Sequence, residues 1–191
     1  MYHSFQAILL FLATLAFASV QNADIIFFSS PGSCNRHDDW VHCSNVTAGY
    51  CCQAKGPFCA RLSCDHCGGN ALAAFRDSAS CPGLDQADAT CTPPSGGTCC
   101  LDAGSKSICT GSYYDSNTKV RSADHEPVGT RSNSTCHTPD GIVYHDAAGV
   151  RREIKNMTVD TYEKVMDLYG RGDFVALSGI ATKYVDGVID G

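Results

Sequence analysis

The sequence predicts a small disulfide-rich fold, a duplicated cysteine module, followed by a small α+β unit. Three observations predict it: 13 cysteines confined to positions 34–136, a cysteine order that occurs twice, and regular apolar periods after the last cysteine. Each disulfide contributes roughly 2–4 kcal/mol by restricting the unfolded chain. Because the middle of the chain is polar and Gly-rich, we expect crosslinks to replace an apolar interior there, whereas the C-terminal part must bury a core.

Residues 1–18 are expected to be a cleaved signal peptide. The apolar run from Ala7 to Ala18 is shorter than the roughly 20 residues that cross a bilayer. It ends in Ala16-Phe17-Ala18, which suits signal peptidase. A buried N-terminal helix or a signal anchor stays open as the alternative. No later segment is apolar enough to span a membrane, so we expect a secreted, extracellular protein whose mature chain opens with an N-terminal segment, residues 19–33.

The cysteines indicate an oxidising compartment. Behind a signal peptide, this density predicts a disulfide framework rather than metal sites. All of them are expected to take part, with one left over because the count is odd: Cys34, Cys43, Cys51, Cys52, Cys59, Cys64, Cys67, Cys81, Cys91, Cys99, Cys100, Cys109 and Cys136.

The order C–C–CC–C–C appears in residues 34–80 and again in residues 81–136, and in each unit a Gly lies two positions before the Cys pair, at Gly49 and Gly97. This shared spacing predicts two copies of one module. Vicinal bridges are strained, so the two members of each pair should bond to different strands or loops. Cys67 is the expected odd cysteine, either free or bonded to another chain. The pairing itself stays open.

Residues 137–191 contain no cysteine and predict an α+β unit. Residues 141–154 resemble a hairpin with its turn at Asp146 to Gly149. Asp160 is expected to cap a helix whose buried face carries Tyr162, Val165, Met166 and Tyr169, with Gly170 as its C-cap. Residues 174–177 and 183–189 are expected to be strands.

Three N-glycosylation sequons agree with export, at Asn45, Asn133 and Asn156. The formal net charge is -6 and no basic run stands out, so nucleic acid and anionic lipid are not expected partners.

The sequence shows no familiar catalytic motif, nucleophile elbow, zinc helix or phosphate loop, so we expect neither catalysis nor a cofactor. An enzyme of unrecognised type stays open, since site geometry defines an active site.

Cys64-Asp-His-Cys67 has metal-ligand spacing, but the export signal favours two separate disulfides. Arg171-Gly-Asp173 matches an integrin-recognition tripeptide, but a turn after the predicted helix is the favoured explanation. Arg151-Arg152 matches a dibasic cleavage site, and two exposed charges on a hairpin explain it.

The spacing of residues 34–67 resembles hevein-type chitin-binding modules, in which aromatic residues near the fifth cysteine bind sugar, as Phe58 and Tyr50 would here. Gln53 departs from that pattern, because the family carries Ser there. The two Cys pairs are similar to those of fungal hydrophobins, although the loops here are polar. Signal peptide, length and cysteine pattern together resemble fungal small secreted cysteine-rich proteins, many of them effectors. That class shares no fold, so it implies a location and no residues.

The sequence therefore predicts a non-enzymatic secreted protein that acts by binding, as an effector or virulence protein at a host interface. Its partner would be an extracellular protein or a cell-wall polysaccharide. The alternatives are a carbohydrate-binding protein and a cystine-knot-like inhibitor or toxin. Aromatic residues of the modules are the candidate contacts, and small satellite cores are the alternative role for them: Trp40, Tyr50, Phe58, Tyr113 and Tyr114.

Overall fold

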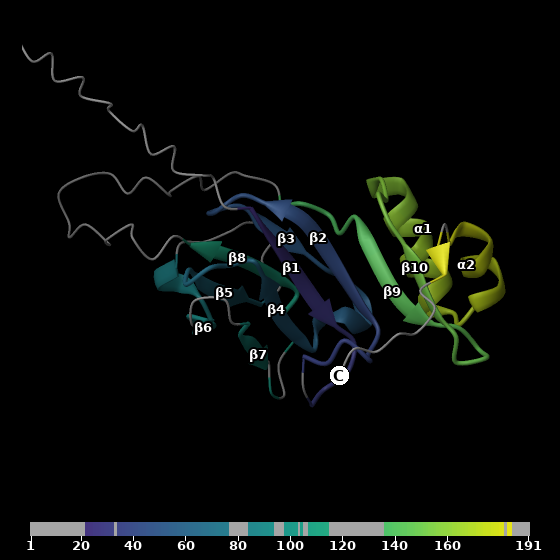
Figure 1. Ribbon diagram of the computed structural model, residues 1–191, viewed down its shortest axis with the longest axis horizontal. Helices are drawn as coiled ribbons and strands as arrows, with labels where there is room; N and C mark the ends of the chain where they lie inside the picture. Colours follow the sequence, from purple (N-terminus) through teal and green to yellow (C-terminus); the bar gives the residue numbers. More distant parts are fainter. Residues whose placement is uncertain are drawn as a thin grey trace, which may run out of the picture.

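The computed structural model is built from two antiparallel sheets and two helices. It describes residues 22–32, 34–76, 84–93, 98–102, 104, 107–114, 136–181 and 183–184. Figure 1 shows the sheets facing each other on one side of the molecule and the helices on the other side.

The larger sheet, sheet A, has seven strands in the order β11-β10-β9-β2-β1-β4-β7. Their bounds are β1 Ala23–Phe28, β2 Trp40–Val46, β4 Arg61–Asp65, β7 Cys100–Asp102, β9 Gly141–His145, β10 Arg151–Ile154 and β11 Lys183–Tyr184. β1 lies near the centre and pairs with β2 and β4. All four residues Ile25 to Phe28 are fully buried, as expected for a strand covered on both faces.

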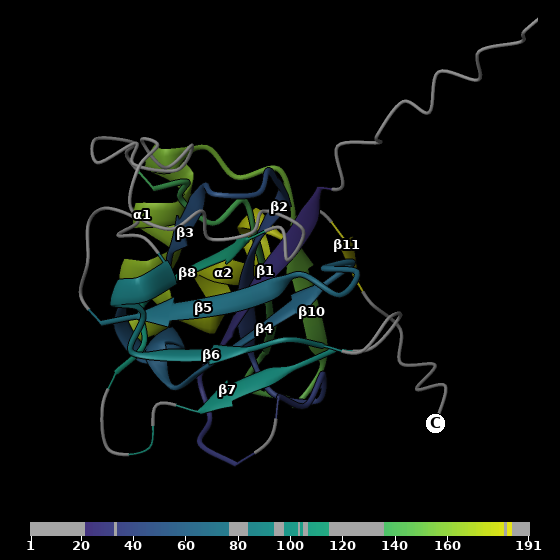
Figure 2. The same cartoon turned by 90° about the vertical axis from the view of Figure 1, so that its left-hand side faces the viewer.

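The smaller sheet, sheet B, has four strands in the order β3-β8-β5-β6. Their bounds are β3 Cys51–Gln53, β5 Ala71–Phe75, β6 Ala89–Cys91 and β8 Thr110–Tyr114. Sheet B packs on the inner face of sheet A, and Gly111 of β8 lies against Leu62 of β4 and Ile25 of β1. A Cβ atom on Gly111 would lie 2.7 Å from Leu62 Cδ1 and 3.1 Å from Ile25 Cγ2, so a larger residue there would displace these side chains. Figure 2 shows β5, β6 and β7 on the side opposite to the helices.

Two helices cover the rest of the inner face, α1 Val159–Gly170 and α2 Phe174–Ile180. Tyr162, Val165 and Leu177 are fully buried in the same core as Ile142 and Tyr144 of β9. Two 3-10 turns complete the described elements, η1 Gly56–Cys59 and η2 Leu84–Gln86. A single apolar core therefore lies between sheet A on one side and sheet B and the two helices on the other.

The expectation that the cysteine-rich middle lacks an apolar interior is wrong. Leu62, Leu72 and Phe75 are at most 1% exposed, and small residues such as Ala73 and Ala74 fill the space around sheet B. The N-terminal segment, residues 19–33, supplies β1 and with it much of this core. The crosslinks add to an apolar interior and do not replace it.

Six disulfides are present in the described part: Cys34–Cys100, Cys43–Cys52, Cys51–Cys136, Cys59–Cys109, Cys64–Cys67 and Cys91–Cys99. Both vicinal pairs reach two separate partners, as expected. Cys67 is not the odd cysteine, because it bonds Cys64, and the idea that this pair enters two separate disulfides is wrong. Cys81 lies outside the described residues.

The duplicated module is not confirmed. Three disulfides join residues 34–80 to residues 81–136, and they link chain positions that are 50 to 85 residues apart. Strands from the predicted C-terminal unit share sheet A with β1, β2, β4 and β7. The repeated spacing in the sequence therefore does not correspond to two repeated disulfide patterns.

Elements of the C-terminal part are close to the expectations, with three corrections. The C-cap of α1 is Arg171 and not Gly170, which is the last residue of the helix. The hairpin of residues 141–154 is confirmed as β9 and β10. Helix α1 is capped by Thr158 and not by Asp160, because the Thr158 side chain accepts a hydrogen bond from the Thr161 amide. Residues 174–177 form the start of helix α2 and not a strand, since the Asp173 carboxylate caps that helix by accepting from the Ala176 amide. The expected strand at residues 183–189 is described only at residues 183–184, which form β11.

Candidate functional site

Three of the five aromatic contact candidates are buried. Phe58 and Tyr113 have no exposed surface and Trp40 is 6% exposed. Phe58 packs against the Tyr169 ring, with centroids 4.9 Å apart, and the Tyr113 hydroxyl donates to the Val46 carbonyl at 2.9 Å. These rings support the fold and present no face to a partner.

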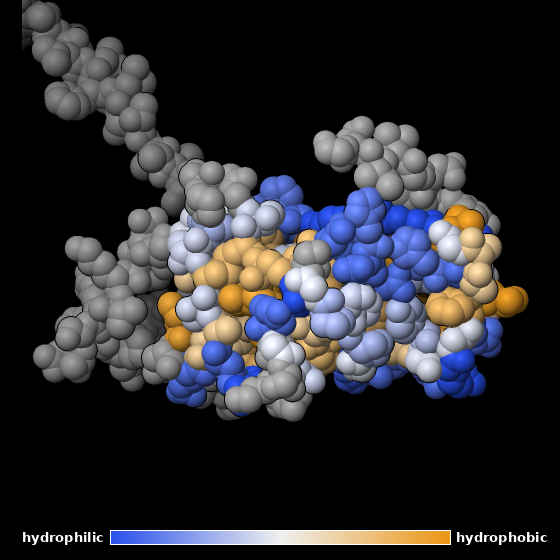
Figure 3. Space-filling view, turned by 90° about the horizontal axis from the view of Figure 1, so that it is seen from below, coloured by the Kyte–Doolittle hydropathy of each residue, from blue (hydrophilic) through white to orange (hydrophobic). Residues whose placement is uncertain are grey.

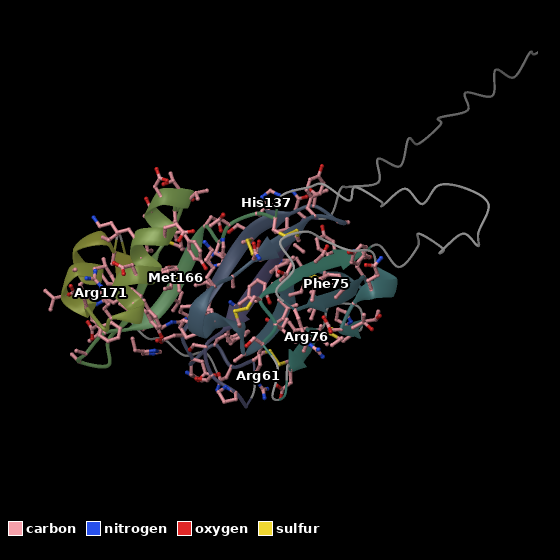
Figure 4. All side chains as sticks on the ribbon, turned by 180° about the vertical axis from the view of Figure 1, so that it is seen from behind. Arg61, Phe75, Arg76, His137, Met166 and Arg171 are labelled. Atoms are coloured by element: carbon pink, nitrogen blue, oxygen red, sulfur yellow. A yellow bond between two sulfur atoms is a disulfide. The ribbon has the colours of Figure 1, made fainter. Side chains whose placement is uncertain are left out.

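Tyr50 and Tyr114 keep partly exposed surface. Gly49 precedes Tyr50, and Tyr113 precedes Tyr114. The Gly49 amide donates to the Tyr113 carbonyl, so the two chain segments that carry these tyrosines are adjacent. The exposed His137 ring lies edge-on to Tyr50, with centroids 5.9 Å apart. Figure 4 shows His137 at the upper edge of the molecule and Arg61 at the lower edge. We call Tyr50, Tyr114 and His137 the aromatic edge.

The outer face of sheet A carries a second, smaller core of Ile26, Phe28, Trp40 and Val143. The β1–β2 loop, residues 29–39, folds back over it: Arg36 lies 4.9 Å from the Trp40 ring centroid, and its guanidinium pairs with Asp65. Cys34 bonds Cys100 of β7. This loop is therefore fixed to the sheet by a disulfide, an ion pair and a cation–π contact.

His42 lies beside Trp40 on the outer face, with ring centroids 5.1 Å apart. The ring fits because the cross-strand neighbour is Gly141, where a Cβ atom would lie 1.9 Å from His42 Cε1. Burial lowers the pKa of His42, against the opposing effect of Asp140 and other carboxylates. Its buried Nδ1 has no hydrogen-bond partner in the described part of the chain. The imidazole is therefore held neutral.

A carboxylate joins the β1–β2 loop to β9 and α1. One oxygen of Asp39 accepts from the His145 amide at 2.9 Å and lies 2.7 Å from His145 Nδ1. The other accepts from the Tyr169 hydroxyl at 2.6 Å. Burial, together with the bond to Asp39, raises the pKa of Tyr169, so the phenol remains a donor. We call Asp39, His145 and Tyr169 the junction.

The junction is the one acid–base arrangement among the described residues that resembles a functional constellation. A carboxylate on Nδ1 orients an imidazole with Nε2 outward, as in hydrolytic triads. No described residue hydrogen-bonds Nε2, and no described hydroxyl completes a nucleophile–base pair with it. The geometric effect of the junction is to hold the β1–β2 loop, β9 and α1 together. Sequence reasoning did not find it, because Asp39 is 106 positions from His145 and 130 from Tyr169.

Two of the three sequons lie in the described part, at the opposite end of sheet A from the junction. Asn45 and Asn156 are both exposed and both have left-handed backbones, with φ of 54° and 55°. The Asn45 amide donates to Asp24, and the Met157 amide donates to the Asp140 carbonyl, which places both asparagines beside the ends of β1 and β9. Asn133 lies outside the described residues. Glycosylation stays a prediction.

The remaining motifs have structural roles. Gly172 ends α1 with φ of +70°, its amide and that of Asp173 donating to the Tyr169 and Leu168 carbonyls, which is a Schellman motif. With Asp173 as the cap of α2, the turn explains the Arg171-Gly-Asp173 tripeptide. Arg151 and Arg152 lie within β10, partly buried, and Arg152 pairs with Asp146 at 2.8 Å. The described residues contain no cluster of three or more metal-ligating side chains.

Comparison with protein-family models, curated proteins and solved structures finds no match for this chain. Neither described helix has the length and apolar composition needed to cross a membrane. The six disulfides are compatible with an extracellular role.

Proposed function

We propose that this protein is a secreted, non-enzymatic binding protein that acts outside the cell, of the kind that fungi use as effectors at a host interface. The observation that carries the proposal is the placement of the crosslinks. Cysteines in β3, β6 and β7 bond to partners elsewhere in the fold, and each of these strands lies at the edge of a sheet. Edge strands are where a sheet opens and pairs with other chains.

Rigid loops favour binding, because crosslinked segments lose less conformational entropy when a partner orders them. The β1–β2 loop is fixed by Cys34–Cys100 and by Arg36, and its last residue, Asp39, is fixed by the junction. A surface built in this way resists extracellular proteases and is ready to bind before it meets a partner. The net charge of -6 favours a partner other than nucleic acid.

A pull-down tests this proposal. Oxidised protein is immobilised and exposed to host extracellular fluid and, separately, to isolated cell walls. Saturable binding that disappears after reduction and alkylation of the bait is the expected result. A bait that captures no saturable partner from either source contradicts the proposal. Protease-inhibition and membrane-leakage assays on the same preparation separate it from an inhibitor or toxin.

The aromatic edge favours a second candidate function, binding to a cell-wall glycan. Tyr rings that keep exposed surface can stack on sugar faces, and Tyr50 and Tyr114 are both partly exposed. The pair Tyr50 and Phe58, which the hevein resemblance suggests, is not available because Phe58 is buried. Pelleting with insoluble chitin and other polysaccharides tests this function. Protein left in the supernatant throughout rejects it, and loss of pelleting in Tyr50→Ala but not in Tyr50→Phe supports it.

A further inference from the structure

The β1–β2 loop crosses the outer face of sheet A and is fixed at two points. Cys34 is bonded to Cys100 of β7, and Asp39 belongs to the junction, which ties it to β9 and α1. Between these points lie residues 35–38, a turn at the surface that we call the flap. Figure 3 shows the molecule from below, the side on which Figure 1 places this loop, with mainly hydrophilic surface in the middle. Both ends of the flap would stay in place if the flap itself moved.

One flap side chain, Arg36, lies against the sheet. Its guanidinium carbon is 4.9 Å from the centroid of the Trp40 ring, and the guanidinium pairs with Asp65 of β4. The Arg36 side chain is 43% exposed, so water reaches these contacts. Exposed ion pairs and exposed cation–π contacts are individually weak. A modest change in the local charge is therefore enough to release Arg36.

The Trp40 ring, which is 6% exposed, is held by packing. Its buried Nε1 has no hydrogen-bond partner in the described part of the chain. One neighbour is the Arg36 guanidinium, and another is the His42 imidazole, whose centroid is 5.1 Å from that of the indole. Trp40 therefore contacts one permanent cation and one group that becomes a cation in acid.

His42 is poorly placed to carry a positive charge. Gly141 leaves the imidazole no spare room, because a Cβ atom there would lie 1.9 Å from His42 Cε1. The buried Nδ1 has no hydrogen-bond partner among the described residues. A protonated imidazole needs an acceptor for each of its two N–H groups, and burying a charge without one is costly. Protonation of His42 therefore favours any movement that admits water.

The charged groups that face His42 oppose one another. They are Asp24 of β1, Asp140 just before β9, Glu153 of β10 and Arg36 of the flap. The three carboxylates favour a proton on the ring, but they accept from the Ser44 and Asn45 amides or pair with Lys155, and none of them bonds Nδ1. Burial outweighs their attraction and lowers the pKa of His42, and Arg36 acts in the same direction as burial.

We propose that the flap is an acid-released cover, in which protonation of His42 displaces Arg36 from Trp40 and admits water to both rings. The two cations repel each other, and water supplies the acceptor that the charged imidazole lacks. The Cys34–Cys100 disulfide and the junction keep the loop attached. Such a cover operates whatever partner the protein binds, and in acid it presents an aromatic ring that is buried at neutral pH.

The direction of the response follows from proton linkage. The closed flap holds the pKa of His42 below its ordinary value, so a form in which water reaches the ring binds the proton more tightly. The closed form is therefore favoured at neutral pH, and the open form gains as the pH falls through the pKa of His42 in the closed protein.

Fluorescence quenching tests this cover. Trp40 is the one tryptophan of the chain, so acrylamide quenching of the full oxidised protein reports on this ring alone. We expect the quenching constant to rise about threefold between pH 8 and pH 5, with a midpoint below the ordinary histidine value of about 6.5. His42→Gln should abolish the rise, because glutamine does not titrate. His37→Gln, which removes an exposed imidazole from the flap, is the matched control and should keep it.

A second variant acts on the flap itself. Arg36→Gln removes the cation over Trp40 and keeps His42, so it should show the high quenching constant already at pH 8. It also keeps the test decisive if His42→Gln does not fold. Far-ultraviolet circular dichroism at both pH values checks the fold of each variant. Hydrogen exchange of the wild type at pH 5 should show the loss of protection in residues 35–42 and not in sheet B.

Four results would overturn the acid-released cover. They are a wild-type quenching constant that stays the same from pH 8 to pH 5, a rise that persists in folded His42→Gln, an Arg36→Gln variant that is quenched at pH 8 no more than the wild type, and a rise that accompanies loss of the whole circular dichroism signal. The pull-down of the proposed binding function is independent of all four, because it needs no change of pH.

Discussion

The cystine-bonded part of the chain, residues 34–136, and the cysteine-free part after it protect the edges of their sheets by different means. Both contribute to one core, so apolar burial does not distinguish them. Three of the four sheet edges, β3, β6 and β7, are three-residue strands that contain a cysteine in a disulfide. The fourth edge, β11, belongs to the cysteine-free part, where α1 and α2 cover the neighbouring strands. The comparison teaches that disulfides keep the edge strands in place where a three-residue strand buries too little apolar surface to be stable by packing alone.

The largest expected effect comes from removing a long-range crosslink of an edge strand. Cys51→Ser with Cys136→Ser opens a loop of 85 residues, and the chain-entropy relation gives about 4.5 kcal/mol. Cys91→Ser with Cys99→Ser opens a loop of 8 residues, for about 2.5 kcal/mol. Denaturant unfolding of both double variants measures the difference. Equal losses, or no loss for the first variant, would break the comparison.

In the cysteine-free part, stability should depend on single apolar side chains. Leu177 is fully buried in α2, so Leu177→Ala is expected to cost about 3 kcal/mol. Val175 in the same helix is 86% exposed, so Val175→Ala should change the free energy of unfolding by no more than about 0.5 kcal/mol. Similar values for the two would show that α2 does not pack as described.

Acid should weaken the outer face of sheet A through His42. Burial lowers its pKa in the folded protein, so the unfolded chain binds the proton more tightly. The contribution of neutral His42 is therefore complete above about pH 6.5 and is lost as the pH falls below that value. His42→Leu should flatten the decline in unfolding free energy between pH 7 and pH 5, whereas His37→Ala, at an exposed position, should not. A decline that is unchanged in His42→Leu would count against a buried neutral imidazole.

The smallest effect is expected at the junction. Tyr169→Phe removes one hydrogen bond to the Asp39 carboxylate and should cost about 1.5 kcal/mol, as bonds to charged groups do. Hydrogen exchange should show the loss in the amides of the β1–β2 loop and the end of α1. Loss of protection in sheet B instead would mean that the junction does not act locally.

The sequence predicted what short-range patterns encode. The Asp146 to Gly149 turn signal predicted the hairpin. The spacing of Tyr162, Val165, Met166 and Tyr169 predicted the core-facing side of α1, where Tyr162 and Val165 are fully buried and Met166 and Tyr169 are partly buried. Residues 174–177 were expected to form a strand, but the Asp173 carboxylate caps a helix there, and that capping signal was present in the sequence. The run Ile25 to Phe28 had the continuous apolar character of a strand buried on both faces, which would have placed β1 in the core.

Long-range features could not be predicted from the sequence. The disulfide pairing and the junction depend on contacts between residues 50 to 130 positions apart, and no local pattern encodes them. Gly111 at the sheet interface looks like a loop residue until its neighbours Leu62 and Ile25 are known. For the same reason Trp40, Phe58 and Tyr113 looked like surface contacts, although the fold buries them.

The claim that crosslinks join the two cysteine-rich segments into one fold is tested most directly by peptide mapping of the native protein under non-reducing conditions. The account predicts crosslinked peptides that contain Cys34 with Cys100, Cys51 with Cys136 and Cys59 with Cys109. Crosslinks confined within residues 34–80 and within residues 81–136, or a majority of reduced thiols, would contradict it.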